Sequence, residues 1–183
     1  MHPAKFLQLL NLKSPSLTRQ SAGHNLWQWQ DVAAALGMGQ LSPLAIELGR
    51  AKYCEDDDSC QNLLQLMKNV AQQQARVHKW RAHKTLLPRL AQLAVYEMLS
   101  AQLCKSCRGR GVTRRGITCT DCKGQGRQPL KAAQRYHFAG IDKRNWERRW
   151  QNRYEVVYGC LCEAESQLLS HLSWQLNDGS TAK

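Results

Sequence analysis

The sequence lacks any long apolar run. Nowhere do about 18 apolar residues follow one another, the length that a membrane-spanning helix needs, so no membrane partner is expected. Residues 1–12 hold an apolar patch but neither a basic leader nor a small-residue cleavage site, so no signal peptide is predicted. These absences favour the cytoplasm, where cysteines are usually free thiols or metal ligands rather than disulfides.

Motifs of common enzyme chemistry are also missing. The chain has no phosphate-binding glycine loop, no nucleophile elbow and no paired carboxylates in a setting that supports catalysis. We therefore predict no enzymatic activity and no small-molecule substrate. Long internal repeats, low-complexity tracts and, outside the cysteine segment, alternating strand patterns are absent too, which predicts a mainly helical fold.

Acidic residues are few beside the basic ones. The 183 residues include 14 Asp and Glu against 26 Lys and Arg, a net charge of +12. Residues 105–153 alone carry 14 basic and 3 acidic residues, a net charge of +11, whereas residues 1–104 carry +4 and residues 154–183 carry −3. A concentrated basic segment is the electrostatic footprint expected for nucleic-acid phosphates. A solvated face without a ligand is the alternative, but interleaved aromatic residues and glycines favour nucleic acid.

Helices are expected in the first half of the chain. Asp31 is placed to cap a short helix over 31–36, and a second begins after Ser42 and runs over 43–53, because proline suits a first helical turn. Apolar spacing predicts further helices over 60–80 and 88–103. Between these two lies a basic stretch that is suited to phosphate or to a protein partner.

Four cysteines form two matching knuckles. Each has the pattern Cys-x-x-Cys-x-Gly-x-Gly, and the cysteines are Cys104, Cys107, Cys119 and Cys122. Two residues between thiols let one tight turn direct both sulfurs at an ion, and two such turns complete a tetrahedron. Because all four positions are cysteine, none is left open for water. We predict one structural Zn²⁺ in a zinc ribbon with a short hairpin, whose tip carries Arg114 and Arg115.

The remaining cysteines and histidines predict no second metal site. Cys54 and Cys60 have five residues between them along the chain, and Cys160 and Cys162 have one between them on an expected helix, where they cannot share a face. They are expected to be free cysteines. His137 lies near the cysteine segment and is expected to be a core or surface residue.

Residues 130–158 predict a helix-turn-helix. A short helix ends at Gly140, and Asp142 caps a second helix with an aromatic stripe, which is expected to be core. The opposite face is rich in arginine, which can bond guanine, and asparagine, which can bond adenine, while flanking cations bind phosphates. The predicted DNA contacts, including the ribbon tip, are Arg114, Arg115, Arg135, Lys143, Arg144, Asn145, Arg148, Arg149, Asn152 and Arg153.

These signals predict five segments. They are a flexible N-terminal segment (1–27), a helical domain that supplies core and polymerase contacts (28–103), the zinc ribbon (104–127), the basic helix-turn-helix with a C-terminal helix (128–176), and a disordered tail (177–183).

Three features together resemble the late-gene antitermination (Q) proteins of lambdoid bacteriophages. They are the segment over 31–38 followed by helix to Cys54, the paired cysteine knuckles, and the basic helical tail with its Gly-Ile turn. The resemblance covers residues 28–175 in the order of elements, and the knuckles match residue by residue. The loop between the cysteine pairs, 11 residues, is shorter than in some members.

The resemblance implies a function in transcription. Such proteins bind double-stranded DNA within a phage late promoter and load onto the paused bacterial RNA polymerase holoenzyme. They then travel with the polymerase, which reads through pauses and terminators in the host cytoplasm. Groups within the family read different DNA sites, so neither base-contacting nor polymerase-contacting residues transfer to this chain.

Two other classes of protein stay open. DnaJ-like co-chaperones contain similar knuckles, but they carry four repeats and a His-Pro-Asp motif, and this chain has two repeats and no such motif. A promoter-binding regulator of initiation, or an RNA binder, would have a similar basic half. The N-terminal half, about 100 residues with little excess charge, favours a protein–protein role beyond holding DNA.

Overall fold

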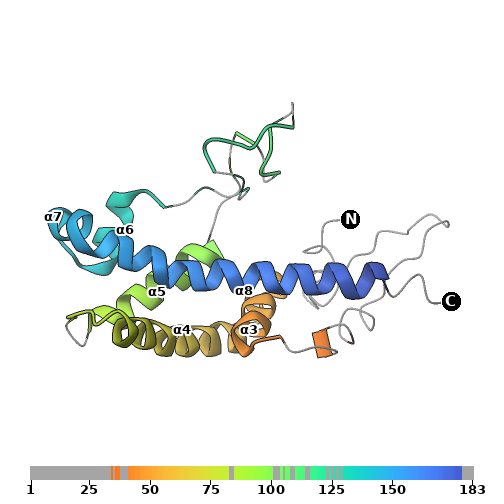
Figure 1. Ribbon diagram of the computed structural model, residues 1–183, viewed down its shortest axis with the longest axis horizontal. Helices are drawn as coiled ribbons and strands as arrows, with labels where there is room; N and C mark the ends of the chain where they lie inside the picture. The colour runs from red at the N-terminus through yellow and green to blue at the C-terminus, as the bar shows by residue number, and fades with distance from the viewer. Residues whose placement is uncertain are drawn as a thin grey trace. The chain divides into compact units, whose positions relative to one another are not determined.

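The computed structural model describes most of the chain after residue 40 (Figure 1). The described residues are 34, 36–37, 41–82, 85–100, 104, 106–107, 110–113, 116–122, 124, 126, 128 and 130–178. The predicted flexible segment 1–27, the start of the first predicted helix, and the hairpin tip at Arg114 and Arg115 lie outside them.

The described residues are mainly helical, as predicted. The elements are α3 (Pro43–Tyr53), α4 (Asp57–Val77), α5 (Leu86–Ser100), α6 (Ala132–Ala139), α7 (Lys143–Asn145), the π-helix η2 (Trp146–Trp150) and α8 (Gln151–Asp178). Strand pairing in this part of the chain is limited to an isolated antiparallel bridge between Val112 and Thr118. No helix within the described ranges is long and apolar enough to cross a membrane.

Local sequence explains where α3 and α4 begin. The Ser42 side chain accepts a hydrogen bond of 3.2 Å from the Ala45 N–H, and Pro43 occupies the first turn of α3. Asp57 and Asp58 lie in the first turn of α4, where carboxylates complement the positive end of the helix dipole. The helix predicted over 43–53 is confirmed, and the one predicted over 60–80 corresponds to α4.

The chain divides into two compact units. One comprises Met1–Met67 with Gly159–Lys183, and the other comprises Lys68–Tyr158. In the first unit, a buried core is built from Ala45, Leu48, Leu63, Met67, Leu161, Leu168 and Leu172. At its edge, Lys52 and the Tyr53 hydroxyl both donate to Glu165 on α8.

The second unit contains the cysteine knuckles and the basic helices. Its helical core comes from the end of α4, from α5, from η2 and from the start of α8. The buried apolar residues include Ala71, Leu90, Leu93, Ala94, Met98, Trp146, Trp150, Tyr154 and Val157. Helix α6 packs against α5, and the exposed rings of Tyr96 and Phe138 stack between these helices, with centroids 5.3 Å apart.

Candidate metal centre and nucleic-acid interface

The four knuckle cysteines meet in one buried cluster. Cys104, Cys107, Cys119 and Cys122 are each at most 2% exposed, and all their sulfurs lie within 4.8 Å of one another. The Sγ atoms of Cys107 and Cys122 are 3.6 Å apart, and those of Cys104 and Cys119 are 3.9 Å apart. Four sulfurs placed about 2.3 Å from a tetrahedral ion would be about 3.8 Å apart. The donor set and its spacing therefore fit a metal ion.

The backbone of the two knuckles is held by reciprocal hydrogen bonds. The Cys104 N–H donates to the Gly126 carbonyl over 2.9 Å, and the Cys119 N–H donates to the Gly111 carbonyl over 2.8 Å. The glycine N–H groups in turn point at sulfur: Gly111 at Cys107 over 3.3 Å and Gly126 at Cys122 over 3.2 Å. Such N–H···S bonds stabilise thiolate ligands from outside the coordination shell.

Glycine is required at the crossing of the knuckles. Gly111 and Gly126 have φ values of +73° and +74°, in the left-handed region that favours glycine. A Cβ on Gly111 would lie 2.2 Å from the Gly124 carbonyl oxygen, which is backbone and cannot swing aside. Gly111 therefore serves a steric purpose, and Gly126 supplies a backbone angle that favours glycine.

Without a cation, the surroundings of the Cys122 thiol favour its protonated form. Burial, opposed by the Gly126 N–H, raises the pKa of Cys122 to about 11, with further increases from hydrogen bonds to the other three thiols. A bound metal ion would displace the Cys122 proton and place a positive charge in the middle of the cluster. Among the described residues this is the only group of cysteines, histidines and acids that could hold a metal.

The turn between α6 and α7 has the predicted cap residues. Gly140 adopts φ +68° and ends α6, and Asp142 accepts a hydrogen bond of 2.9 Å from the Asn145 N–H at the start of α7. The predicted aromatic stripe is core, since Trp146, Trp150 and Tyr154 are all buried. The sequence did not predict the π-helix from Trp146 to Trp150, a feature that often marks functional sites.

Several predicted DNA contacts gather at this turn. Arg144, Asn145, Arg148 and Arg149 line a surface depression of about 430 Å³ together with Asp142. All five residues are exposed. Within the part of the chain that the structure describes, no carboxylate pairs with the three arginines, and Asp142 already accepts from the Asn145 backbone. The depression is therefore strongly cationic.

The other predicted contacts lie in different surroundings. Lys143 is exposed and faces Glu147 at 3.8 Å, and Asn152 is exposed on α8. The half-buried Arg153 guanidinium stacks over two rings, 4.6 Å from the Trp150 centroid and 5.6 Å from the Trp80 centroid. Burial and the positive charge of Arg149 lower the pKa of Arg153, a sign of how crowded the positive charge is.

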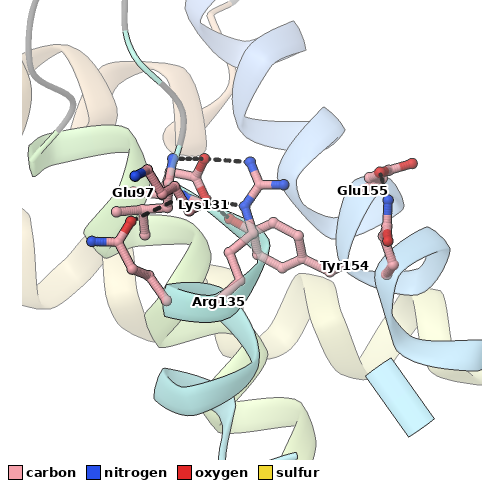
Figure 2. A network of polar contacts seen from close by, with 8 residues as sticks. Glu97, Lys131, Arg135, Tyr154 and Glu155 are labelled. Atoms are coloured by element: carbon pink, nitrogen blue, oxygen red, sulfur yellow. Dashed lines mark hydrogen bonds and ion pairs between the residues drawn. The ribbon is translucent and has the colours of Figure 1, made fainter. Parts of the chain in front are cut away.

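Arg135 is half-buried and is bound to a buried carboxylate. Its Nε and Nη2 donate to Glu97 over 2.9 and 2.5 Å (Figure 2). Glu97 is 2% exposed and also accepts from the Leu130 N–H over 3.1 Å and from the Tyr154 hydroxyl over 2.6 Å. One carboxylate thus joins α5, the segment that leads into α6, α6 itself and α8.

Sequence reasoning missed Glu97. The available signal was its position: it is the only acidic residue between Asp58 and Asp121, and it lies on a helix rich in apolar residues. Burial, followed by the hydrogen bond to Glu97, raises the pKa of Tyr154 far above its ordinary value. For Arg135, burial works to lower the pKa, but hydrogen bonding and the charge of Glu97 outweigh it and raise the pKa.

Fold and site together define a mainly helical protein with a four-cysteine cluster that could hold a metal. No protein-family model and no curated protein matches the chain.

Proposed function

We propose that this protein binds double-stranded DNA through the arginine-lined depression at α7 and η2. The observation that carries the proposal is the cluster of Arg144, Arg148 and Arg149 on exposed helix, without acidic partners among the described residues. The buried Trp146 and Trp150 beneath them fix the backbone on which these arginines are mounted. Exposed guanidinium groups around one depression suit phosphates and guanine edges.

In this proposal α6 and the helix that begins after Asp142 act as a helix-turn-helix. The second helix would lie in the major groove with its first residues toward the bases, as recognition helices do. Arg144, Asn145 and Arg148 are then the candidate base contacts, and Lys143, Arg149, Asn152 and Arg153 the candidate phosphate contacts. Arg135 is left out because two of its nitrogens are engaged by Glu97.

One structural Zn²⁺ is the proposed occupant of the cysteine cluster. Cys104, Cys107, Cys119 and Cys122 would supply all four ligands, leaving no position for a reacting water. Zinc would hold the two knuckles together as a ribbon, and the loop with Arg114 and Arg115 would add phosphate contacts. The protein would then act by binding and not as an enzyme.

The biological role that we propose is late-gene antitermination in a phage-infected bacterium. DNA binding would load the protein onto paused host RNA polymerase holoenzyme, which would then read through terminators. The support is the resemblance of the cysteine knuckles and the basic helical tail to phage Q proteins, together with the helices α3, α4 and α5, of which α3 starts at the predicted place. A zinc-containing regulator of initiation and a co-chaperone-like zinc module are the competing functions.

In vitro transcription separates these functions. Bacterial RNA polymerase would transcribe a template in which the DNA immediately downstream of this protein's gene serves as the promoter and a terminator follows it. The control is the same template with an unrelated promoter. Readthrough on the first template alone is the expected result. Altered initiation with unchanged termination would make the protein a regulator of initiation, and no effect on either would overturn the antitermination role.

A binding experiment tests the DNA interface itself. Arg148→Ala should weaken binding to the cognate site by about 1–3 kcal/mol if this arginine reads a base. Equal losses on cognate and random DNA would make it a phosphate contact. The matched control is Arg50→Ala, which removes an exposed arginine of the first unit that is paired with Asp56 at 2.9 Å. No loss with Arg148→Ala on either DNA would exclude this residue from the interface.

A further inference from the structure

A second basic surface lies at the turn between α4 and α5. From residue 59 to residue 96 the sequence contains no acidic residue and six basic ones. The turn holds a depression of about 550 Å³ whose lining includes Arg76, Lys79, Trp80 and Leu87. The lining residues, as far as the structure describes them, include no carboxylate. The surface has the charge of an anion site but not the acidic groups that would neutralise it.

The backbone at Lys79 has a conformation that costs a lysine stability. Its φ is +52°, the left-handed region that non-glycine residues adopt at a cost of order 1 kcal/mol. The turn ends α4 with two hydrogen bonds, from the Lys79 N–H to the Arg76 carbonyl over 3.2 Å and from the Trp80 N–H to the Ala75 carbonyl over 2.8 Å. Helices with this ending usually place glycine where Lys79 stands. A lysine in this position suggests that its exposed side chain is needed.

This surface is joined to the arginine-lined depression through Arg153. The Arg153 guanidinium lies over the ring of Trp80, which lines the α4–α5 depression, and over the ring of Trp150 in η2. Arg149, which lines the other depression, is close enough for its charge to act on Arg153. Cationic side chains therefore continue from one depression to the other within the second unit.

We propose that Arg76 and Lys79 at the α4–α5 turn bind backbone phosphates of the same DNA duplex that the α7–η2 face holds. The inference depends on the proposed DNA binding and extends it to a segment outside the cysteine ribbon and the helix-turn-helix. A duplex is favoured over an acidic protein segment because the surface is continuous with the arginine face through Arg153. Lysine and arginine on a helix end neutralise phosphates without reading sequence.

The test compares the salt dependence of DNA binding in two variants. Arg76→Gln and Lys79→Gly each remove one charge, and Lys79→Gly also relieves the backbone strain, so its thermal stability should equal or exceed that of the wild type. Each lost phosphate contact should reduce the slope of log K against log salt by about 0.9 and weaken binding about eightfold near 0.1 M salt. The loss should be the same on cognate and random duplexes. Lys68→Gln, a charge removal on α4 outside the depression, is the control.

The outcomes are distinct. Reduced slopes for Arg76→Gln and Lys79→Gly, with a wild-type slope for Lys68→Gln, would support the proposal. If Arg148→Ala weakens DNA binding while the two turn variants keep wild-type affinity and slope, this inference fails and the proposed DNA interface stands. The wild-type protein could instead bind an acidic leucine-containing peptide that the two turn variants no longer bind. If these variants also keep wild-type DNA binding, the surface belongs to a protein partner and the proposal is overturned. If the wild-type protein binds no duplex, the proposed function and this inference fail together.

Discussion

Removing the charge of Glu97 should cost the second unit much of its stability. Glu97→Gln keeps the shape of the side chain but replaces one acceptor oxygen with an NH₂ donor. Both oxygens are in use, Oε1 by the Leu130 N–H and Arg135 Nη2 and Oε2 by Arg135 Nε and the Tyr154 hydroxyl. Either orientation of the amide therefore sets a donor against a donor.

The magnitude follows from burial. The Glu97 side chain is 2% exposed and that of Arg135 is 17% exposed, so the guanidinium charge would be left without its partner in a largely dry site. Breaking a buried ion pair on one side typically costs about 3–5 kcal/mol. For a urea m-value of about 2 kcal/mol per molar, the unfolding midpoint should fall by about 2 M.

The assay is urea unfolding monitored by circular dichroism, and a second, exposed ion pair serves as the reference. Lys143 and Glu147 are exposed and 3.8 Å apart, so Glu147→Gln should cost less than about 0.5 kcal/mol. Adding Arg135→Gln to Glu97→Gln should destabilise much less than the sum of the single changes, because the stranded charge is gone. A midpoint for Glu97→Gln as high as that of Glu147→Gln would refute the reasoning.

Three further predictions concern the cysteine knuckles and the buried tyrosine. Cys107→Ser should lower zinc content well below one equivalent and unfold the knuckles, since metal affinity there is folding free energy; one retained equivalent, measured by atomic absorption, would contradict the assignment. Gly111→Ala should do the same, because its Cβ would lie 2.2 Å from a backbone oxygen, whereas Gly116→Ala, at φ +77° with nothing within 4 Å, should lose only about 1 kcal/mol and keep the metal. Burial and hydrogen bonding raise the pKa of Tyr154 above that of an unfolded tyrosine, so its contribution to stability should be full below about pH 10 and fall as pH rises further. Tyr154→Phe should flatten that alkaline decline in urea midpoints, and an unchanged pH slope would count against this role.

The sequence was sufficient wherever a rule acts over a few neighbouring residues. Ser42 and Pro43 start α3, Gly140 ends α6, and Asp142 caps α7, because capping needs only short-range hydrogen bonds and allowed backbone angles. The pairing of the cysteine knuckles was predictable for a related reason. Ligand spacing and glycine positions are written into the repeat, and one metal requires all four sulfurs together.

The sequence by itself therefore determined the helical character, the four-cysteine cluster and the burial of the aromatic stripe. Only the tertiary structure decided which charged side chains are paired with buried partners of opposite charge. Arg135 cannot be told from the neighbouring arginines by sequence alone. In the structure it is bound by Glu97, which lies 38 residues earlier in the chain on α5, whereas Arg148 lies on the surface. Likewise Trp80 and Arg153 are far apart along the chain and meet only in the fold. Local patterns fix local conformation, but the partner of a charge depends on long-range packing, which no spacing rule along the chain encodes.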